Sequence, residues 1–360
     1  NAPGVASPRT AAKIAAFCAT FLAAKNHHDR GRNRNHAQTL LKPYLAPRIW
    51  GGKTLATLCP SVAQAAEPIG EVWIVGGSQV VSNGLYAGNT LDELYRRFPS
   101  RLGNMKNYSE AGFPLLIKWL RAERWLSIQV HPNDSWARRL SGCSAQGKEE
   151  AWYVTQSEPG AELIFGVHPH SHCNDFLHTA GAEMLNFLSK IKPTVGDCLC
   201  LKPGLVHALG PGITVLEVQQ NSELTYRLYD WDRLGLDGQP RQLHLEEAAA
   251  VLRDCWSVNL DKKEKPDLAG PSLPPTVGQV LLQAEHFRLE VLKAEDVSAW
   301  LTDPFFPEIV VCTKGALHVS LQSQSEKLQN GQACLLAAGQ VPVELDFEPM
   351  AEAVRITSSR

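Results

Sequence analysis

The chain has 360 residues, enough for more than one average domain and for a core that needs no disulfide bonds. Hydrophobic residues make up 44% and charged residues 20%, a composition that is typical of globular proteins and excludes wholesale disorder. The 35 lysines and arginines nearly balance the 37 aspartates and glutamates, which excludes a general polyanion binder. We therefore expect no nucleic-acid partner, and an anionic ligand would need a local cluster of cations.

The nine cysteines are scattered along the chain, and no two of them form a CxxC pair. Their odd number and irregular spacing predict no disulfide framework and favour a reducing compartment. We therefore expect the protein in the cytoplasm.

Residues 1–40 differ from the rest in being basic and polar around one apolar run, Ile14–Ala24, inside a predicted helix over Thr10–Lys25. That run is too short to cross a bilayer, so no membrane partner is expected. Two interpretations stay open for the segment. It is a tolerated N-terminal extension, which we favour, or it is the core of a signal or transit peptide.

Further along the chain, Thr90–Phe98 has a threonine start, an early acid and the apolar spacing of a short helix. Residues 113–231 alternate apolar and polar positions between glycine, proline and asparagine, which predicts strands. Gln242–Trp256 is expected to be a helix. Its apolar face would consist of Leu243, Ala248, Val251 and Leu252.

A charged and then proline-rich stretch precedes a final series of short predicted strands. The organisation expected from this pattern is an extension, a catalytic domain, a linker and a second β domain, at 1–40, 41–258, 259–278 and 279–360. The last unit offers only two histidines, His286 and His318, and no comparable cluster, so we expect it to be structural.

The most informative segment is LSIQVHPND, residues 126–134. On a strand, Leu126, Ile128 and Val130 would form one apolar face. The opposite face would carry Ser127, Gln129 and His131. Such a polar row either faces solvent as an ordinary strand face or lines a site, and alone it does not decide between them.

Two further segments carry side chains of the same chemistry. GKEEAWYV (147–154) places Lys148, Glu150 and Trp152 on one strand face, and GDCLCLKPGLVHALGPG (196–212) contributes His207 after a turn. Two imidazoles, one carboxylate and one amide oxygen suit a borderline divalent metal with room for water or substrate. Each residue alone is more often a surface or core polar group, so the prediction depends on their joint occurrence.

The segment from 213 to 233 continues the polar pattern. Six of its residues share one parity, namely Glu217, Gln219, Asn221, Glu223, Thr225 and Arg227. We expect Asn221-Ser222 to break the strand. The alternative interpretation is an exposed edge strand that carries charge.

Together, LSIQVHPND, GKEEAWYV and VHALGPGITVLEVQQNSELTYRLYDWDR closely resemble the type I mannose-6-phosphate isomerases, zinc-dependent enzymes of the cupin superfamily. RIWGG, IGEVWIV and FPLLIKWL fit the same family, and the spacing resembles its short branch. The resemblance covers residues 41–233 with specific motifs and the rest more loosely. It implies a mainly β fold of two cupin-like, jelly-roll barrels, with a few helices decorating the first.

The resemblance also implies the site residues. The zinc ligands, one ion per chain, would be Gln129, His131, Glu150 and His207. Arg227, Lys148 and Glu217 would be catalytic, and Lys118, Ser127 and Arg227 would bind the sugar phosphate. The chain departs from the family at Glu149, where a small or neutral residue is usual, and at Leu209, where longer members have a tyrosine. His168, His170 and His172 alternate like a metal face but are expected to be loop residues.

The activity implied is the interconversion of D-mannose 6-phosphate and D-fructose 6-phosphate through an enediol, which would feed mannose metabolism and GDP-mannose synthesis. Either Glu217 or Lys148 could transfer the proton. A cupin that binds a sugar phosphate without turning it over is the alternative. The retention of Lys118, Lys148, Glu217 and Arg227 favours the enzyme. We expect a monomer or weak dimer.

Overall fold

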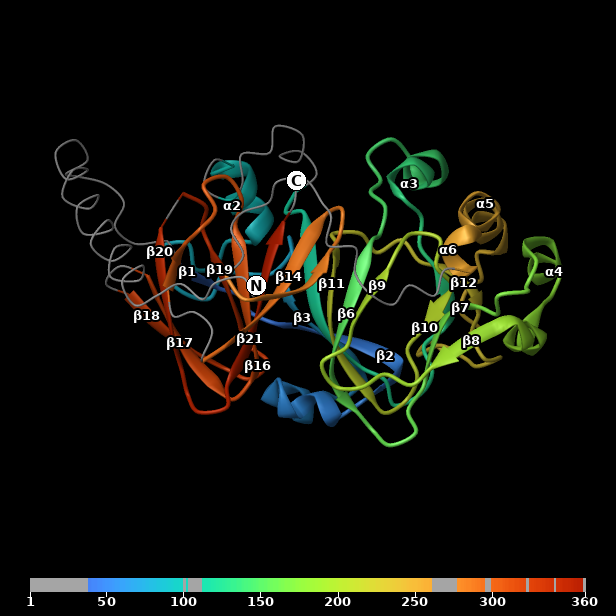
Figure 1. The fold of residues 1–360 in the computed structure, drawn as a ribbon, viewed down its shortest axis with the longest axis horizontal. Coiled ribbons are helices and arrows are strands. Elements are labelled where there is room, and N and C mark those ends of the chain that lie inside the picture. Colours follow the sequence, from blue (N-terminus) through green and yellow to red (C-terminus); the bar gives the residue numbers. More distant parts are fainter. Residues whose placement is uncertain are drawn as a thin grey trace, which may run out of the picture.

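The computed structural model describes residues 38–99, 102, 112–260, 277–294, 299–321, 324–339 and 341–358. The predicted helix at Thr10–Lys25 and most of the predicted linker lie outside these ranges. The described chain is mainly β and forms two cupin-like barrels, each made of two facing sheets (Figure 1). No helix in the described ranges is long and apolar enough to cross a membrane.

The first barrel joins a sheet of six strands to a sheet of five. In spatial order the six are β2 (Tyr44–Gly52), β3 (Ile69–Val75), β4 (Leu115–Arg121), β11 (Ile213–Gln220), β6 (Glu150–Ser157) and β9 (Cys198–Leu201). The five are β12 (Tyr226–Tyr229), β5 (Ile128–Val130), β10 (His207–Ala208), β7 (Leu163–Val167) and β8 (Leu188–Ile191).

The second barrel joins a sheet of six strands to a sheet of four. The six are β1 (Gln38–Leu40), β19 (Ala333–Leu336), β16 (Glu308–Lys314), β21 (Glu352–Ser358), β14 (Phe287–Lys293) and β13 (Gln279–Gln283). The four are β15 (Ala299–Leu301), β20 (Pro342–Phe347), β17 (Ala316–Leu321) and β18 (Gln324–Gln329). Strand β1 pairs with β19 although it falls within the predicted N-terminal extension.

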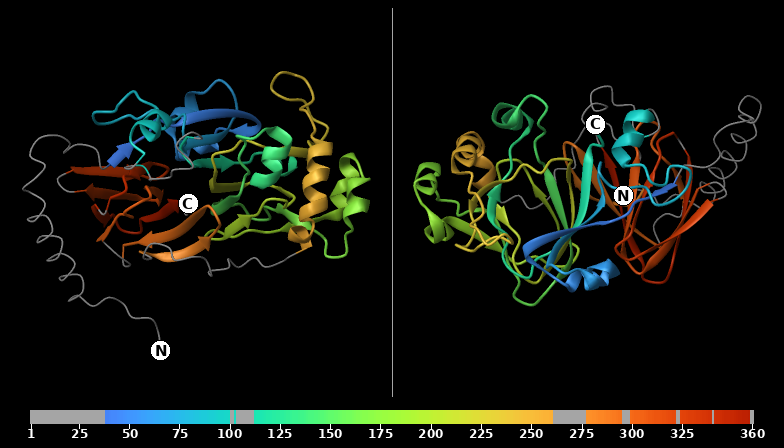
Figure 2. Two further views of the ribbon diagram at one scale, coloured as in Figure 1. Left: turned by 90° about the horizontal axis from the view of Figure 1, so that it is seen from above. Right: turned by 180° about the vertical axis from the view of Figure 1, so that it is seen from behind.

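The helices flank the strands, and most of them belong to the first barrel (Figures 1 and 2). They are η1 (Thr54–Thr57), η2 (Pro60–Gln64), α2 (Leu91–Arg97), α3 (Asp134–Ser141), α4 (Cys173–Leu177), η3 (Gly181–Phe187), α5 (Leu245–Cys255) and α6 (Ser257–Leu260). The predicted helix at Thr90–Phe98 is confirmed as α2. Thr90 and Glu93 form a reciprocal capping box at its start.

Helix α5 begins three residues later than the sequence predicts. Its neighbours Gln242 and His244 instead bond to strand β12, because Arg227 Nη1 donates to Gln242 O and His244 N donates to Arg227 O. Leu243 is consequently exposed before the helix, and its expected place on the apolar face is wrong. Ala248 and Val251 are buried as predicted.

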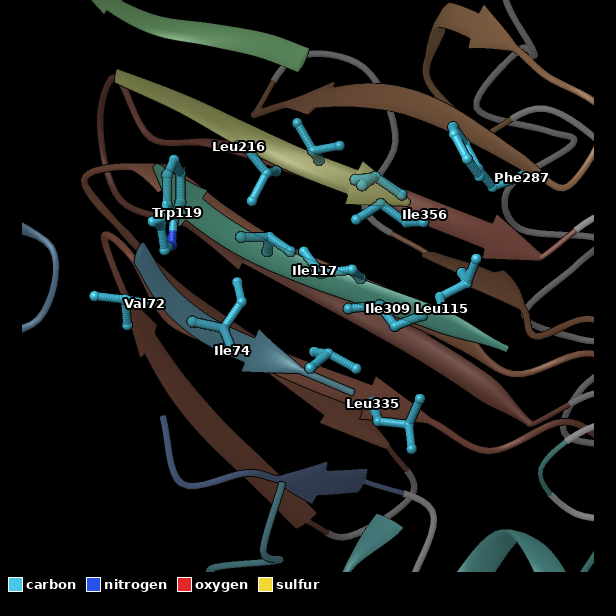
Figure 3. Packing of buried hydrophobic residues seen from close by; sticks show 14 of the residues in the cluster. Val72, Ile74, Leu115, Ile117, Trp119, Leu216, Phe287, Ile309, Leu335 and Ile356 are labelled. Atoms are coloured by element: carbon cyan, nitrogen blue, oxygen red, sulfur yellow. The ribbon is translucent and has the colours of Figure 1, made fainter. Parts of the chain in front are cut away.

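The two six-stranded sheets pack face to face and form the largest core of the molecule (Figure 3). Ile117 and Trp119 of β4 meet Ile309 of β16 and Ile356 of β21 there. Polar contacts cross the same interface, since Trp119 Nε1 donates to Gly331 O at 2.9 Å. Because side chains alternate along a strand, each sheet turns its other face into its own barrel. The side chains that do not enter the core between the two six-stranded sheets therefore point into the interior of their own barrel.

Candidate active site and metal centre

Strands of both sheets bring two histidines and a glutamate together inside the first barrel. His207 of β10 lies opposite Gln129 of β5 in the ladder, His131 follows β5 directly, and Glu150 begins β6. His207 Nε2 lies 3.1 Å and His131 Nε2 3.5 Å from Glu150 Oε1. All three side chains are almost fully buried, and each offers one ligand atom within 4.8 Å of the others. This arrangement could hold a metal ion.

The two imidazoles are oriented through their other nitrogens. His131 Nδ1 lies 2.8 Å from Leu224 O and His207 Nδ1 lies 2.9 Å from Leu205 O. A carbonyl accepts only, so each Nδ1 carries the proton and each Nε2 turns a lone pair toward Glu150. Burial, together with the charge of Lys148, lowers the pKa of His131 to about 3. A neutral imidazole is the form that a metal binds.

Glu150 provides the charge of this cluster. Both of its carboxylate oxygens are buried and lack a well-aligned hydrogen-bond donor in the described chain, although Lys148 Nζ lies 2.7 Å from Oε2. Burial alone would raise the pKa of Glu150, but the positive charge of Lys148 outweighs it and lowers the pKa well below its usual value. Buried carboxylate oxygens without donors fit the place of a cation.

Gln129 completes the set that the resemblance implies. Its Nε2 lies 3.2 Å from His207 Nε2, and its Oε1 accepts a hydrogen bond from Ser127 Oγ at 3.3 Å. A half-turn of the amide would exchange the two atoms and present oxygen to the cluster. Two imidazole nitrogens, a carboxylate and an amide oxygen are the donors that a borderline ion such as zinc takes.

A cavity of about 820 Å³ opens beside the cluster. The predicted residues that line it are Lys118, Ser127, Gln129, Lys148, Glu217 and Arg227. They come from β4, β5, β6, β11 and β12 or from residues next to these strands. The polar rows inferred from strand parity therefore face the barrel interior, and the alternative of exposed strand faces is wrong for them.

One wall of the cavity is a chain of alternating charges. Lys118 Nζ lies 2.8 Å from Glu217 Oε1 and 3.7 Å from Glu71 Oε2, and Arg48 Nε lies 2.9 Å from Glu71 Oε1. Trp152 Nε1 holds the second Glu217 oxygen at 2.8 Å. Burial opposes the charge on Glu71, but Lys118 and Arg48 outweigh it and lower its pKa to about 2. For Lys118, the two carboxylates outweigh burial and raise the pKa.

Glu71 and Arg48 are site residues that sequence reasoning missed. Both occur in segments that match the family, Glu71 within IGEVWIV and Arg48 at the start of RIWGG. Glu71 is the one charged residue in a fully buried strand, β3. A buried charge must be paired, so this exception within an apolar strand is the signal that could have revealed it.

Arg227 differs from the other cations of the cavity. Arg48, Lys118, Lys148 and Arg241 are each paired with a carboxylate. Arg227 has no carboxylate within ion-pair distance among the described residues, and its guanidinium donates to Ser127 Oγ at 3.3 Å and Gln242 O at 2.7 Å. Burial, reinforced by Arg241, lowers its pKa. A half-buried cation without a counter-ion favours an anionic ligand.

The strand that carries Glu217 ends where the sequence predicts. Strand β11 stops at Gln220, and Arg227 belongs to β12 in the facing sheet, opposite Gln129. Asn221 Nδ2 donates to Phe113 O at 2.8 Å, a contact that fixes the break. The chain reversal places Glu217 and Arg227 in different walls of one cavity, which one unbroken strand could not do.

Other sequence candidates lie outside the site. His168, His170 and His172 are exposed in the loop before α4, as predicted. Glu149 points away from the cavity, because its Oε2 lies 2.9 Å from His286 Nδ1 of the second barrel. Leu209 is buried in the core between the two sheets of the first barrel.

Comparisons with known proteins agree with this geometry. Residues 39–176 match the family model for the catalytic domain of type I phosphomannose isomerases. The mannose-6-phosphate isomerase of Streptococcus mutans is 34% identical over 301 residues, which cover 82% of this chain and 91% of that protein. ManA, a mannose-6-phosphate isomerase of Bacillus subtilis, is 38% identical over 59% of this chain and 66% of its own.

The fold agrees as well. The crystal structure of a mannose 6-phosphate isomerase from Bacillus subtilis superposes with a TM-score of 0.73 at 25% identity, covering 90% of this chain and all of that one. The resemblance carried by the sequence motifs is thereby confirmed. The chain belongs to the type I phosphomannose isomerase family of enzymes.

Proposed function

We propose that this chain interconverts D-mannose 6-phosphate and D-fructose 6-phosphate with one zinc ion, held by Gln129, His131, Glu150 and His207. The observation that carries the proposal is the buried His-Glu-His cluster beside a cavity whose wall holds the unpaired Arg227. Zinc bound there would supply Lewis acidity toward the oxygens on C1 and C2 of the sugar.

The reaction moves a proton between C2 and C1 through an enediol. A base removes the C2 proton of the aldose and returns it to C1, while the hydroxyl proton of O2 is exchanged for one on O1. Glu217 is the better candidate base, because its carboxylate faces the cavity with lone pairs. The Lys148 ammonium, paired with Glu150, has hydrogens to donate but no lone pair. It would donate to the developing oxyanion.

The phosphate needs hydrogen-bond donors and positive charge of its own. Arg227 can offer a planar fork without breaking an ion pair, and Ser127 Oγ lies within 3.3 Å of its Nε. Lys118 adds a second positive charge, although Glu217 and Glu71 neutralise part of it. We propose that these three side chains bind the sugar phosphate.

We further propose that the product feeds mannose metabolism and GDP-mannose synthesis, that the chain acts as a monomer or weak dimer, and that it works in the cytoplasm. The eight cysteines in the described ranges are all free, which supports the last point.

A variant of a proposed ligand tests the function. His207→Ala should lose zinc and isomerase activity together, measured by elemental analysis and by mannose 6-phosphate turnover. Simultaneous replacement of His168, His170 and His172 by alanine is the matched control and should change neither. Full zinc and full activity in His207→Ala would refute the proposed centre.

A further inference from the structure

The second barrel repeats the topology of the first strand by strand. The order β3-β4-β11-β6-β9 in the first barrel corresponds to β13-β14-β21-β16-β19 in the second. The facing sheet shows the same correspondence, β5-β10-β7-β8 against β15-β20-β17-β18. Each of these nine strands has its counterpart ten strands later, so residues of the two barrels can be equated through the registers of their ladders.

These registers place three charged residues of the second barrel on site positions of the first. Glu217 lies opposite Lys118, and Arg355 lies opposite Glu290. Two residues further along the same strands, Gln219 lies opposite Glu150, and Thr357 lies opposite Glu308. Arg355 therefore corresponds to Glu217, Glu290 to Lys118, and Glu308 to the proposed ligand Glu150.

The facing sheet of the second barrel has no imidazole at the position of His207. In the first barrel His207 of β10 lies opposite Gln129 of β5. The buried pair between the equivalent strands β20 and β15 is Val343 and Trp300. The second barrel thus keeps the carboxylate of the cluster, but its ladder puts an apolar residue where the first barrel has His207.

The guanidinium of Arg355 bridges the carboxylates of Glu308 and Glu290. Arg355 Nε lies 2.7 Å from Glu308 Oε2, and Nη1 lies 3.0 Å from Glu290 Oε2. The guanidinium carbon lies 5.6 Å from the Trp300 ring centre, and Trp300 Nε1 donates to Glu308 Oε2 at 2.9 Å. Asp303 N donates to the other Glu308 oxygen at 2.7 Å. The side chains of Arg355, Glu308 and Glu290 are at most 1% exposed.

We propose that the second barrel contains a second cation site, built on the ladder positions of the first, and that the guanidinium of Arg355 permanently occupies it. The site is specific for a planar cation that donates several hydrogen bonds while resting on an aromatic ring. Without an imidazole it does not suit zinc. The proposal concerns a different barrel from the catalytic one and does not depend on the reaction.

The proposal predicts chemical rescue. Arg355→Ala keeps Cβ and removes the atoms that ethylguanidinium would replace. It leaves the buried Glu308 without a cation, whereas Glu290 keeps Arg288 at 2.6 Å. The variant should melt roughly 10 °C below the parent chain, because an uncompensated buried charge is strongly destabilising. Ethylguanidinium at about 10 mM should raise its Tm by roughly 3 °C or more in a saturable way.

Controls separate this site from general stabilisation. Ethylammonium at the same concentration should not rescue, since it lacks the fork, and the parent chain should not respond to either ion. A double variant, Arg355→Ala with Glu308→Gln, removes one of the bridged charges. It should melt above the single variant and be insensitive to ethylguanidinium.

The solubility and melting temperatures of the variants, and their rescue by each ion, test the proposed site. If the single variant is insoluble while the double variant folds, the requirement for a resident cation is supported. A single variant as stable as the parent chain, or a double variant that melts at or below the single one, would overturn it. Equal rescue by ethylammonium would show that any positive charge suffices and would refute a site for guanidinium.

Discussion

Glu150 and Glu308 occupy equivalent positions in the two barrels, yet their surroundings differ. In the second barrel, Asp303 N holds one oxygen of Glu308, and Trp300 Nε1 and Arg355 Nε hold the other. In the first barrel, neither oxygen of Glu150 has a well-aligned donor in the described chain. The comparison teaches that a carboxylate satisfied by its own protein supports the fold, whereas an unsatisfied one beside a cavity is available for chemistry.

The cations follow the same rule. Arg355 forms ion pairs with two glutamates, Glu290 and Glu308, while Arg227 has no carboxylate partner among the described residues. For Arg355, the two carboxylates outweigh burial and raise the pKa. For Arg227, burial and neighbouring arginines lower it. An arginine that has no carboxylate partner among the described residues is the one expected to bind a substrate anion.

Neutralising the equivalent carboxylates Glu150 and Glu308 one at a time tests whether their roles differ. Glu150→Gln should reduce kcat/KM roughly a thousandfold or more, because it removes the charged side chain among the four proposed metal ligands, while the second barrel stays intact. Glu308→Gln should leave kcat/KM within about threefold and lower Tm instead, because it removes one of the two carboxylates that pair with the buried Arg355. Steady-state kinetics and thermal melts on both variants check this. A large activity loss in Glu308→Gln would contradict the division of roles.

Removing Arg227, which has no carboxylate partner among the described residues, should have the next largest effect on kcat/KM. Arg227→Ala should cost roughly 3 kcal/mol of transition-state stabilisation, about a hundredfold in kcat/KM, with zinc content unchanged. Arg227→Lys keeps the charge but loses the planar fork and should restore little. Near-normal kinetics in a folded, zinc-loaded Arg227→Ala would show that the role is wrongly assigned. If Lys148→Met then abolished activity, the charge-stabilising role would pass to the lysines.

The chain of alternating charges around Glu71 should also make the stability of the first barrel depend on pH in acid. The pKa of Glu71 is depressed from 4.5 to about 2, so its stabilisation is complete above about pH 4.5 and is lost as the pH falls toward 2. Between pH 5 and pH 3 the metal-free parent chain should lose about 2 kcal/mol more unfolding free energy than Glu71→Gln. Urea unfolding at both pH values measures this. Equal losses would mean that Glu71 is not held ionised.

The smallest expected effect concerns the N-terminus. Deleting residues 1–37 should leave activity and Tm nearly unchanged, whereas deleting 1–40 also removes strand β1 from the second barrel and should lower Tm by a few degrees, roughly 1 kcal/mol. Activity should survive both deletions. A loss of soluble protein on removing 1–37 would contradict the predicted extension.

The sequence predicted the chemistry of the first barrel better than that of the second. The alternation of side chains along the strands put Gln129, Lys148 and Glu217 on polar faces. Side chains of the types that bind metals could be recognised from the sequence alone. Glu71 escaped because its partners, Arg48 and Lys118, are distant in sequence. A buried charge in an apolar strand cannot be assigned until its counter-ions are known.

The second barrel was expected to offer only His286 and His318 and no comparable cluster. His286 instead pairs with Glu149 across the barrels, and the buried ionic cluster contains no histidine. Glu290, Glu308 and Arg355 lie in three strands that are far apart in sequence, so their burial and pairing follow from tertiary packing. The predicted domain boundaries at 41–258 and 279–360 stay a prediction. Strand β1, which comes from the predicted N-terminal extension, belongs to the second barrel.

The number of zinc ions bound per chain shows which barrel holds the metal. Elemental analysis of the purified chain, of Glu150→Gln and of Glu308→Gln should give one, close to zero and one zinc per chain, respectively. That result would place the single metal in the first barrel and leave the second to Arg355. Two ions per chain, or a zinc content that falls in Glu308→Gln but not in Glu150→Gln, would contradict the account.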